Sequence, residues 1–141
     1  MLFRSTQSST STVVIPLLHG PMGEDGTVQG LLELAHVAYV GSGVLGSAIA
    51  MDKSVAKQIM ATNNIAQQKF LTVRETDDPV SAIDRAIVEL GLPLFVKPAN
   101  MGSSIGVSKA KTRLDALMSL AKAFEYVEWV LVEEAVTGRE I

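Results

Sequence analysis

Short apolar runs alternate with segments of helical periodicity along most of this chain. A helix or a strand must bury its apolar face against another element, so this alternation predicts an α/β or α+β architecture. The first run has no polar interruption and is expected to be a strand buried on both faces. The expected strands are residues 12–18, 37–40, 68–73, 94–97, 104–108 and 128–133.

Residues with capping chemistry mark the expected helix ends. Asp25 or Thr27 can cap a first helix, Asp52 a second and Asp78, followed by proline, a third. Asparagines 63 and 64 are expected to stop the second helix. The apolar faces expected to be buried are Val28, Leu31, Leu32 and Ala35; Val55, Ala56, Ile59 and Met60; Val80, Ile83, Ile87 and Leu90; and, in a fourth helix, Leu114, Leu117, Met118, Ala121 and Phe124.

Composition narrows the class of protein. The length of 141 residues suits one ordinary domain, and 48% hydrophobic residues suffice for a core. The absence of cysteine excludes a disulfide scaffold, a thiolate zinc site and a cysteine nucleophile. A net charge of −3 argues against a nucleic-acid partner, and no apolar run approaches the ~20 residues of a membrane helix. Residues 1–11 resemble a disordered lead-in rather than a signal sequence, which favours the cytoplasm.

A literal G-x-G-x-x-G runs from Gly41 to Gly46, between an expected strand and an expected helix. In dinucleotide-binding folds these glycines let backbone amides approach a pyrophosphate. That fold also needs an acidic residue about 20 positions later, at the end of the next strand. Asp52 comes too early for this role and Glu75 rather late, so a tight turn between domains is the favoured interpretation. No P-loop sequence is present.

The segment from Lys97 to Val107 carries the strongest local indication of chemistry. A lysine ends an apolar strand, and a loop of small residues containing Ser103 and Ser104 leads back towards another strand. The ammonium group, together with amides and hydroxyls free of bulky neighbours, would suit phosphate oxygens. The alternative is a plain β-hairpin with a solvated lysine. The two interpretations stay open at this point.

A loop beyond the first expected strand places His19, Glu24 and Asp25 close together in sequence. Ligands of open α/β sheets tend to bind at such positions, although the carboxylates could equally cap a helix. Lys53 is expected at the start of a helix, where the helix dipole disfavours a cation unless an anion lies nearby. A solvated lysine remains the alternative.

Three glutamates, Glu133, Glu134 and Glu140, surround the end of the last expected strand. A solvated acidic edge is the default interpretation. The functional alternative is a nucleotide-binding edge, where backbone groups pair with adenine and a carboxylate accepts hydrogen bonds from two ribose hydroxyls.

Taken together, four blocks of sequence resemble the D-alanine–D-alanine ligases of the ATP-grasp superfamily. The resemblance covers residues 12–141 and implies the end of a Rossmann-like pre-ATP-grasp domain followed by a partial ATP-grasp (α+β) subdomain. Its domains would be residues 12–48 and 49–141. The blocks, in family order, are residues 19–30, residues 39–43 leading to 51–53, residues 91–98 with 102–107, and residues 132–134 with 138–140.

The resemblance also implies roles for individual residues. Lys53 and Lys97 would hold the ATP phosphates, and Ser103 and Ser104 would form the serine pair of the loop, the first placing substrate and the second close to phosphate. The adenine hinge would comprise Glu133 with the main chain of Glu134 and Val136. Glu140 would accept from the ribose, and His19 and Glu24 would lie beside the first D-alanine. No metal ligand is assigned in the chain.

In the reaction that the resemblance implies, ATP phosphorylates the carboxylate of one D-alanine and the amine of a second attacks the acylphosphate. The product serves peptidoglycan precursor synthesis. Family members carry their Mg²⁺ ligands beyond the part matched here, and full-length members are expected to be homodimers. We therefore expect a fragment that is inactive alone, with an unpaired sheet edge at residues 128–133. The alternative is a non-catalytic nucleotide-binding module that acts with a partner chain.

Overall fold

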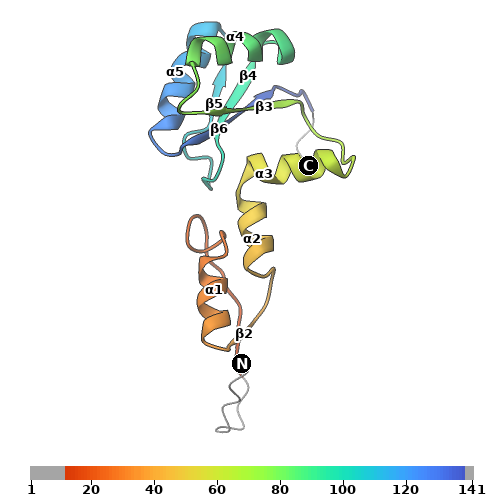
Figure 1. The fold of residues 1–141 in the computed structure, drawn as a ribbon, viewed down its shortest axis with the longest axis vertical. Helices are drawn as coiled ribbons and strands as arrows, with labels where there is room; N and C mark the ends of the chain where they lie inside the picture. Colours follow the sequence, from red (N-terminus) through yellow and green to blue (C-terminus); the bar gives the residue numbers. More distant parts are fainter. Residues whose placement is uncertain (1–11, 139–141) are drawn as a thin grey trace.

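The computed structural model describes residues 12–138, which form two sheets linked by a pair of consecutive helices (Figure 1). The first sheet pairs β1 (Val13–Val14) in parallel with β2 (Ala38–Tyr39), and α1 (Thr27–Leu34) lies between them in sequence. The linking helices are α2 (Val44–Met51) and α3 (Lys53–Thr62). The second sheet holds the remaining strands and is covered by two further helices.

The first strand is shorter and more exposed than predicted. Only two residues of the apolar run 12–18 pair with another strand, and Leu17 is 84% exposed. The expectation of a strand buried on both faces is therefore wrong. The physical reason is that, within residues 12–138, β2 is the only strand beside β1, so most of the run has no sheet neighbour.

Helix α1 begins as expected, but with a different cap. Gly26 occupies the N-cap position in a left-handed conformation, with no side-chain cap. Asp25 lies one residue before this N-cap, and its carboxylate accepts hydrogen bonds from the backbone N–H groups of Met22 and Thr27 at 2.8 and 3.0 Å. The expected apolar face is also wrong in part, because Leu31 is 64% exposed and the buried residue of the helix is Gln29.

Helix α3 begins and ends where the sequence predicts. The Asp52 side chain caps it by accepting from the N–H of Val55 at 3.0 Å, and Asn63 is its C-cap. Its predicted apolar stripe is not a buried stripe, since Val55, Ile59 and Met60 are all exposed. Helix α3 makes polar contacts with the sheet, where the Ser54 hydroxyl lies 3.3 Å from that of Thr72.

The second sheet is antiparallel, in the order β3–β6–β4–β5. Its strands are β3 (Phe70–Arg74), β4 (Leu94–Pro98), β5 (Ser108–Ala110) and β6 (Trp129–Glu134). The predicted unpaired edge at residues 128–133 is wrong, because β6 pairs with β3 on one side and with β4 on the other. The edges are β3 and β5.

The strand after the small-residue loop begins later than predicted. Ser103, Ser104 and Gly106 all have positive φ values, which a continuous strand cannot accommodate. The predicted strand 104–108 is therefore displaced to residues 108–110. The intervening residues form turns, with the N–H of Ile105 donating to the carbonyl of Gly102 at 3.0 Å.

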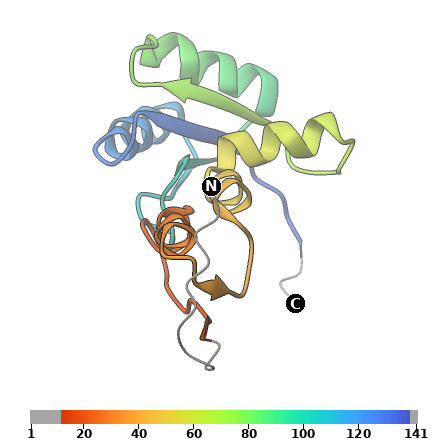
Figure 2. The same cartoon turned by 60° about the horizontal axis from the view of Figure 1, so that its bottom comes forward.

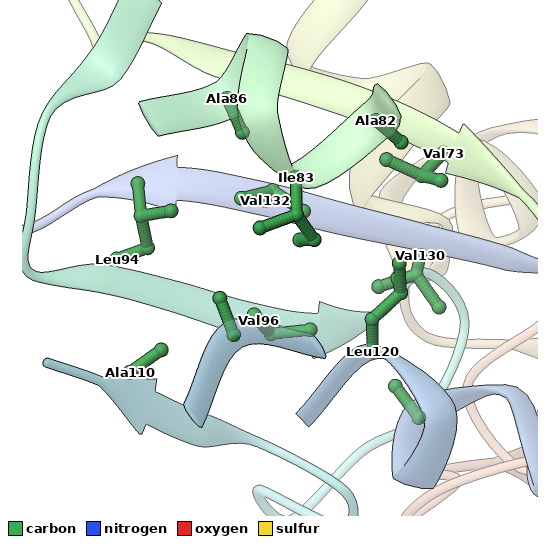
Figure 3. Close-up of a cluster of buried hydrophobic side chains, with 12 residues drawn as sticks. Val73, Ala82, Ile83, Ala86, Leu94, Val96, Ala110, Leu120, Val130 and Val132 are labelled. Carbon is green, nitrogen blue, oxygen red and sulfur yellow. The ribbon is translucent and has the colours of Figure 1, made fainter. Parts of the chain in front are cut away.

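One face of the second sheet is covered by α4 (Pro79–Leu90) and α5 (Arg113–Phe124), as Figure 1 shows. Asp78 caps α4 as predicted, and Thr112 with Asp115 forms a capping box for α5. The core lies between these helices and the sheet, where Ile83 from α4 and Leu120 from α5 are fully buried (Figure 3). The opposite face of the sheet is left for α3 and for the polar side chains described next. Figure 2 shows α3 beside β6.

Candidate functional site

A row of four side chains crosses the second sheet on the face opposite the core. The strand register sets Phe70 of β3 beside Glu133 of β6, Glu133 beside Phe95 of β4, and Phe95 beside Lys109 of β5. Lys97 lies two residues beyond Phe95 on β4 and therefore points to the same face. A buried carboxylate thus lies between two aromatic residues, in reach of lysines from neighbouring elements.

Glu133 is the centre of the site. Its side chain is 6% exposed, and its two oxygens bind different lysines. Oε1 pairs with Nζ of Lys57 from α3 at 2.8 Å, and Oε2 pairs with Nζ of Lys97. Burial alone would raise the pKa of Glu133, but the hydrogen bonds from Lys57 and Lys97 and their charges outweigh burial and hold the pKa below its ordinary value.

Lys53 stands at the first turn of α3 and ties that helix to the loop after β4. Its Nζ donates to the carbonyl oxygen of Met101 at 2.6 Å, and its backbone N–H donates to that of Ala99 at 2.8 Å. Burial, followed by the charge of Lys97, lowers the pKa of Lys53, although Asp52 and Glu133 act in the opposite direction. An anion placed between Lys53 and Lys97 would relieve the repulsion between their two ammonium groups.

The small-residue loop is held close against β4 and against the loop that contains Gly20 and Glu24. A Cβ on Gly106, which has φ +72°, would lie 2.6 Å from Cγ of Pro98, so this position requires glycine. A Cβ on Gly102 would lie 3.4 Å from Cα of Gly20 and 3.7 Å from a carboxylate oxygen of Glu24. The loop that carries Ser103 and Ser104 therefore meets the loop that carries Glu24.

Two adjoining pockets, of about 800 and 590 Å³, open over this face of the sheet. Both are lined by Lys53, Lys97, Glu133, Glu134 and Val136, which are five of the predicted nucleotide-binding residues. The smaller pocket adds Glu24, Ser103 and Ser104. The structure thus brings together eight of the residues singled out from the sequence.

Two predicted site residues are not part of this group. His19 is exposed and lines a separate apolar pocket beside α1, so the structure does not bring it to the lysines. Its neighbour Glu24 faces the smaller pocket and accepts a hydrogen bond from the N–H of Gly20 at 2.5 Å. Glu140 lies outside the described residues.

The sequence alone did not single out Lys57, which lines the larger pocket and binds Glu133. One signal was available, because Lys57 lies four residues after Lys53 and must share its helix face. That Lys57 pairs with Glu133 could not be predicted, because the contact between α3 and β6 depends on the order of the strands in the sheet. The glycine-rich turn at residues 41–46 lines neither pocket. The next strand, β3, does not pair with β2, so no dinucleotide-binding βαβ unit forms there.

The lowered pKa of Glu133 means that its ionised carboxylate stabilises the folded chain. We expect Glu133→Gln to lower the free energy of unfolding by about 1–3 kcal/mol at pH 7, because a buried, doubly paired carboxylate is lost. A depressed pKa in the folded state stabilises the chain above the ordinary glutamate pKa of 4.5, and this stabilisation is lost as the pH falls through the folded-state value. Urea unfolding at pH 7 and pH 3 should therefore show the difference between the two chains shrinking in acid.

Other carboxyls with lowered pKa values, such as Asp25, Asp78 and Asp84, titrate in both chains and cancel in this comparison. A difference between wild type and variant that stayed the same at both pH values would contradict the assignment of the effect to Glu133.

The arrangement suits an anion with several negative charges. Three ammonium groups, from Lys53, Lys57 and Lys97, line the larger pocket around the single buried carboxylate of Glu133. The Ser103–Ser104 turn offers backbone and hydroxyl groups beside the smaller one. Among residues 12–138, no group of three or more His, Cys, Asp or Glu side chains could hold a metal ion. No helix in the same range is long and apolar enough to cross a membrane.

Comparison with known families places the chain within a class of ligases. The family model for the D-Ala-D-Ala ligase N-terminus matches residues 2–42, and the model for the D-Ala-D-Ala ligase C-terminus matches residues 59–141. The second match alone spans more than half of the chain, and the two occur in the same order as the two domains. The chain therefore belongs to the D-alanine–D-alanine ligase family, and the resemblance noted in the sequence is confirmed.

Individual relatives agree with this assignment. The D-alanine–D-alanine ligase of Geobacillus thermodenitrificans is 49% identical over 97% of this chain and 39% of the relative. D-alanine–D-alanine ligase A of Chromobacterium violaceum is 48% identical over 92% of this chain and 35% of the relative. The chain thus spans about two fifths of the length of these proteins.

Solved structures confirm the predicted fold class. The D-alanine–D-alanine ligase of Coxiella burnetii superposes with a TM-score of 0.87 at 33% identity, over 94% of this chain and 39% of that one. The VanG D-Ala:D-Ser ligase of Enterococcus faecalis superposes with a TM-score of 0.81 at 37% identity, over 89% of this chain and 36% of that one. The mixed α/β architecture is therefore that of this ligase family.

Proposed function

We propose that this chain forms the ATP-binding wall of an ATP-dependent D-alanine–D-alanine ligase. The observation that carries the proposal is the convergence of Lys53, Lys57 and Lys97 on one pocket, next to the Ser103–Ser104 turn, in a chain of this family. Peptidoglycan precursor synthesis would use the D-alanyl-D-alanine product, and the demand for ATP favours the cytoplasm as its location.

Individual roles follow from where the side chains lie. We assign Lys53 and Lys97 to the phosphate oxygens, with Ser104 close to phosphate and Ser103 helping to place substrate. The edge formed by Glu133, Glu134 and Val136 would take the adenine, and Glu140 the ribose. Glu24, which faces the smaller pocket, would lie beside the first D-alanine together with His19, if the latter turns from its present pocket. We keep residues 12–48 and 49–141 as the proposed division between the two domains.

The lysines act by neutralising charge. ATP would supply the phosphoryl group that activates a carboxylate, and bringing these anions together is the main electrostatic obstacle. Ammonium groups already gathered in the pocket lower that cost, since at partly buried side chains their interaction with phosphate is screened less than in bulk water. The Ser103–Ser104 turn fixes the orientation of the groups it binds. Residues 12–138 contain no group of three or more carboxylate or imidazole side chains that could hold a metal ion, so the Mg²⁺ ligands that the resemblance implies would come from outside the described residues.

The proposal is tested by titrating the purified chain with ATP and with AMP in a calorimeter. Because Lys53 and Lys97 would contact the β- and γ-phosphates, which AMP lacks, ATP should bind at least about tenfold more tightly than AMP. Equal affinity for both nucleotides, or no binding, would contradict the proposal.

The same sample separates the ligase from the alternative module. We expect no D-alanine-dependent phosphate release from these 141 residues alone, because they span only about two fifths of the length of the relatives they match. Turnover by the isolated chain would overturn that expectation of inactivity. ATP binding that no partner ligase segment converts into turnover would favour the non-catalytic module.

A further inference from the structure

Of the three lysines that line the two pockets, Lys57 is the one without an individual role in the proposed function. Its side chain is 13% exposed, less than half the 28% of Lys97, and its Nζ lies 2.8 Å from Oε1 of Glu133. The same Nζ lies 3.4 Å from both the backbone and the side-chain oxygen of Gln68 and 5.2 Å from the centre of the Phe70 ring. Lys57 is therefore fixed by several partners at once.

Two interactions compete for the ammonium group of Lys97. It is paired with Oε2 of Glu133, yet the proposed function needs its ammonium group at a phosphate. If Lys97 were the sole cation at Glu133, its departure would leave a carboxylate that is 6% exposed unpaired, and an unpaired buried charge is costly. The cost would oppose phosphate binding.

We propose that Lys57 is a positioning residue that keeps Glu133 neutralised and in place while Lys97 moves from Glu133 to the bound phosphate. The inference rests on the proposed function. Each lysine binds its own oxygen of Glu133, so one can leave while the other stays. The more exposed Lys97 is the one free to move. The vacated Oε2 is then available to an amino group of the ligand.

Further contacts indicate that Lys57 is held in place more firmly than Lys97. The side-chain amide of Gln67 donates to the carbonyl oxygen of Lys57 at 2.7 Å, which ties the middle of α3 to the segment before β3. Lys97 is flanked on its own strand by Phe95, whose ring centre is 5.6 Å from its Nζ and 5.5 Å from that of Lys109. Lys57 and Lys109 are thus both lysines near an aromatic ring of the same row, but only Lys57 binds Glu133 among the described contacts.

A direct role of Lys57 as a phosphate ligand is the competing explanation, and a base-free anion separates the two. Inorganic tripolyphosphate needs Lys97 but makes no use of Glu133. Under our proposal, Lys57→Met leaves Lys97 trapped by Glu133 and weakens tripolyphosphate binding about tenfold. Glu133→Gln releases Lys97 and strengthens binding. The double variant should then bind like Glu133→Gln, because no carboxylate remains to be neutralised.

Calorimetric titration of these variants decides the question. Lys57→Arg should recover most of the affinity, since a guanidinium can also hold Glu133. The matched control is Lys109→Met, which removes a lysine from the same row without touching Glu133, and it should change affinity less than about threefold. Thermal unfolding reports whether each variant is folded. A merely structural Lys57 would lower the melting temperature without the rescue seen in the double variant.

Three results would overturn the inference. Unchanged tripolyphosphate binding in Lys57→Met would show that Glu133 needs no second cation. An equal loss from Lys57→Met with and without Glu133→Gln would make Lys57 a direct ligand. A wild-type chain that binds tripolyphosphate but not ATP would contradict the proposed function alone, whereas one that binds neither would remove the basis of both.

Discussion

Lys97→Met is expected to weaken ATP binding by the isolated chain about 10- to 100-fold. A hydrogen bond between charged groups contributes about 1.5–3 kcal/mol, and Lys97 is the more exposed of the two lysines paired with Glu133, lining both pockets. Methionine keeps much of the length and apolar character of the side chain but not its charge. Calorimetric titration of wild type and variant with ATP measures the effect directly.

The matched control for this prediction is Lys122→Met. Lys122 is exposed in the last turn of α5, on the helical layer across the sheet from the site, and the variant has the same net charge as Lys97→Met. A loss confined to Lys97→Met assigns the effect to the pocket. Equal losses in both variants would mean that only overall charge matters, and would contradict a phosphate role for Lys97.

Local chemistry made part of the fold predictable. Asp52 and Asp78 were identified as helix caps because a cap depends only on neighbouring residues, and both accept the expected backbone hydrogen bonds. The strands of the second sheet were found within a few residues for the same reason, since apolar runs bounded by glycine and proline are local patterns. Strand order is not local, and the central place of β6 was missed.

The turn at Ser103 and Ser104 explains a second error of the sequence-based prediction, the position of the strand that follows it. Both residues adopt positive φ values, which serine rarely does, and a sequence pattern gives no sign of this conformation. The strand predicted there was therefore placed too early. Such sparsely populated backbone conformations cluster at ligand-binding sites, which agrees with the role proposed for this loop.

The candidate site was predictable as a set of residues but not as a geometry. Lys53, Lys97 and Glu133 were identified through family motifs, and they do line common pockets. That Glu133 binds lysines on both of its oxygens follows from β6 lying between β3 and β4, with α3 across that face. Lys57 belongs to the site only because of this arrangement, so no motif pointed to it.

Ile83→Ala is expected to lower the free energy of unfolding by about 2–5 kcal/mol. Ile83 is completely buried and points from α4 towards Val132 of the sheet, as Figure 3 shows. The substitution removes apolar surface from the core and leaves a cavity that α4 can close only in part. Since whole domains are stable by about 5–15 kcal/mol, the loss is a large share of the total. Urea unfolding followed by circular dichroism measures it.

Val88→Ala on the same helix is the matched control. Val88 is 85% exposed, so its truncation removes no packing and slightly improves helix propensity. Ile83→Val should fall between the two, at about 0.5–1.5 kcal/mol, because it removes one methylene. If α4 packs on the sheet through Ile83, the loss of unfolding free energy should be largest for Ile83→Ala, smaller for Ile83→Val and smallest for Val88→Ala. If Ile83→Ala cost no more than Val88→Ala, the helical layer would not be what keeps β6, and with it Glu133, in position.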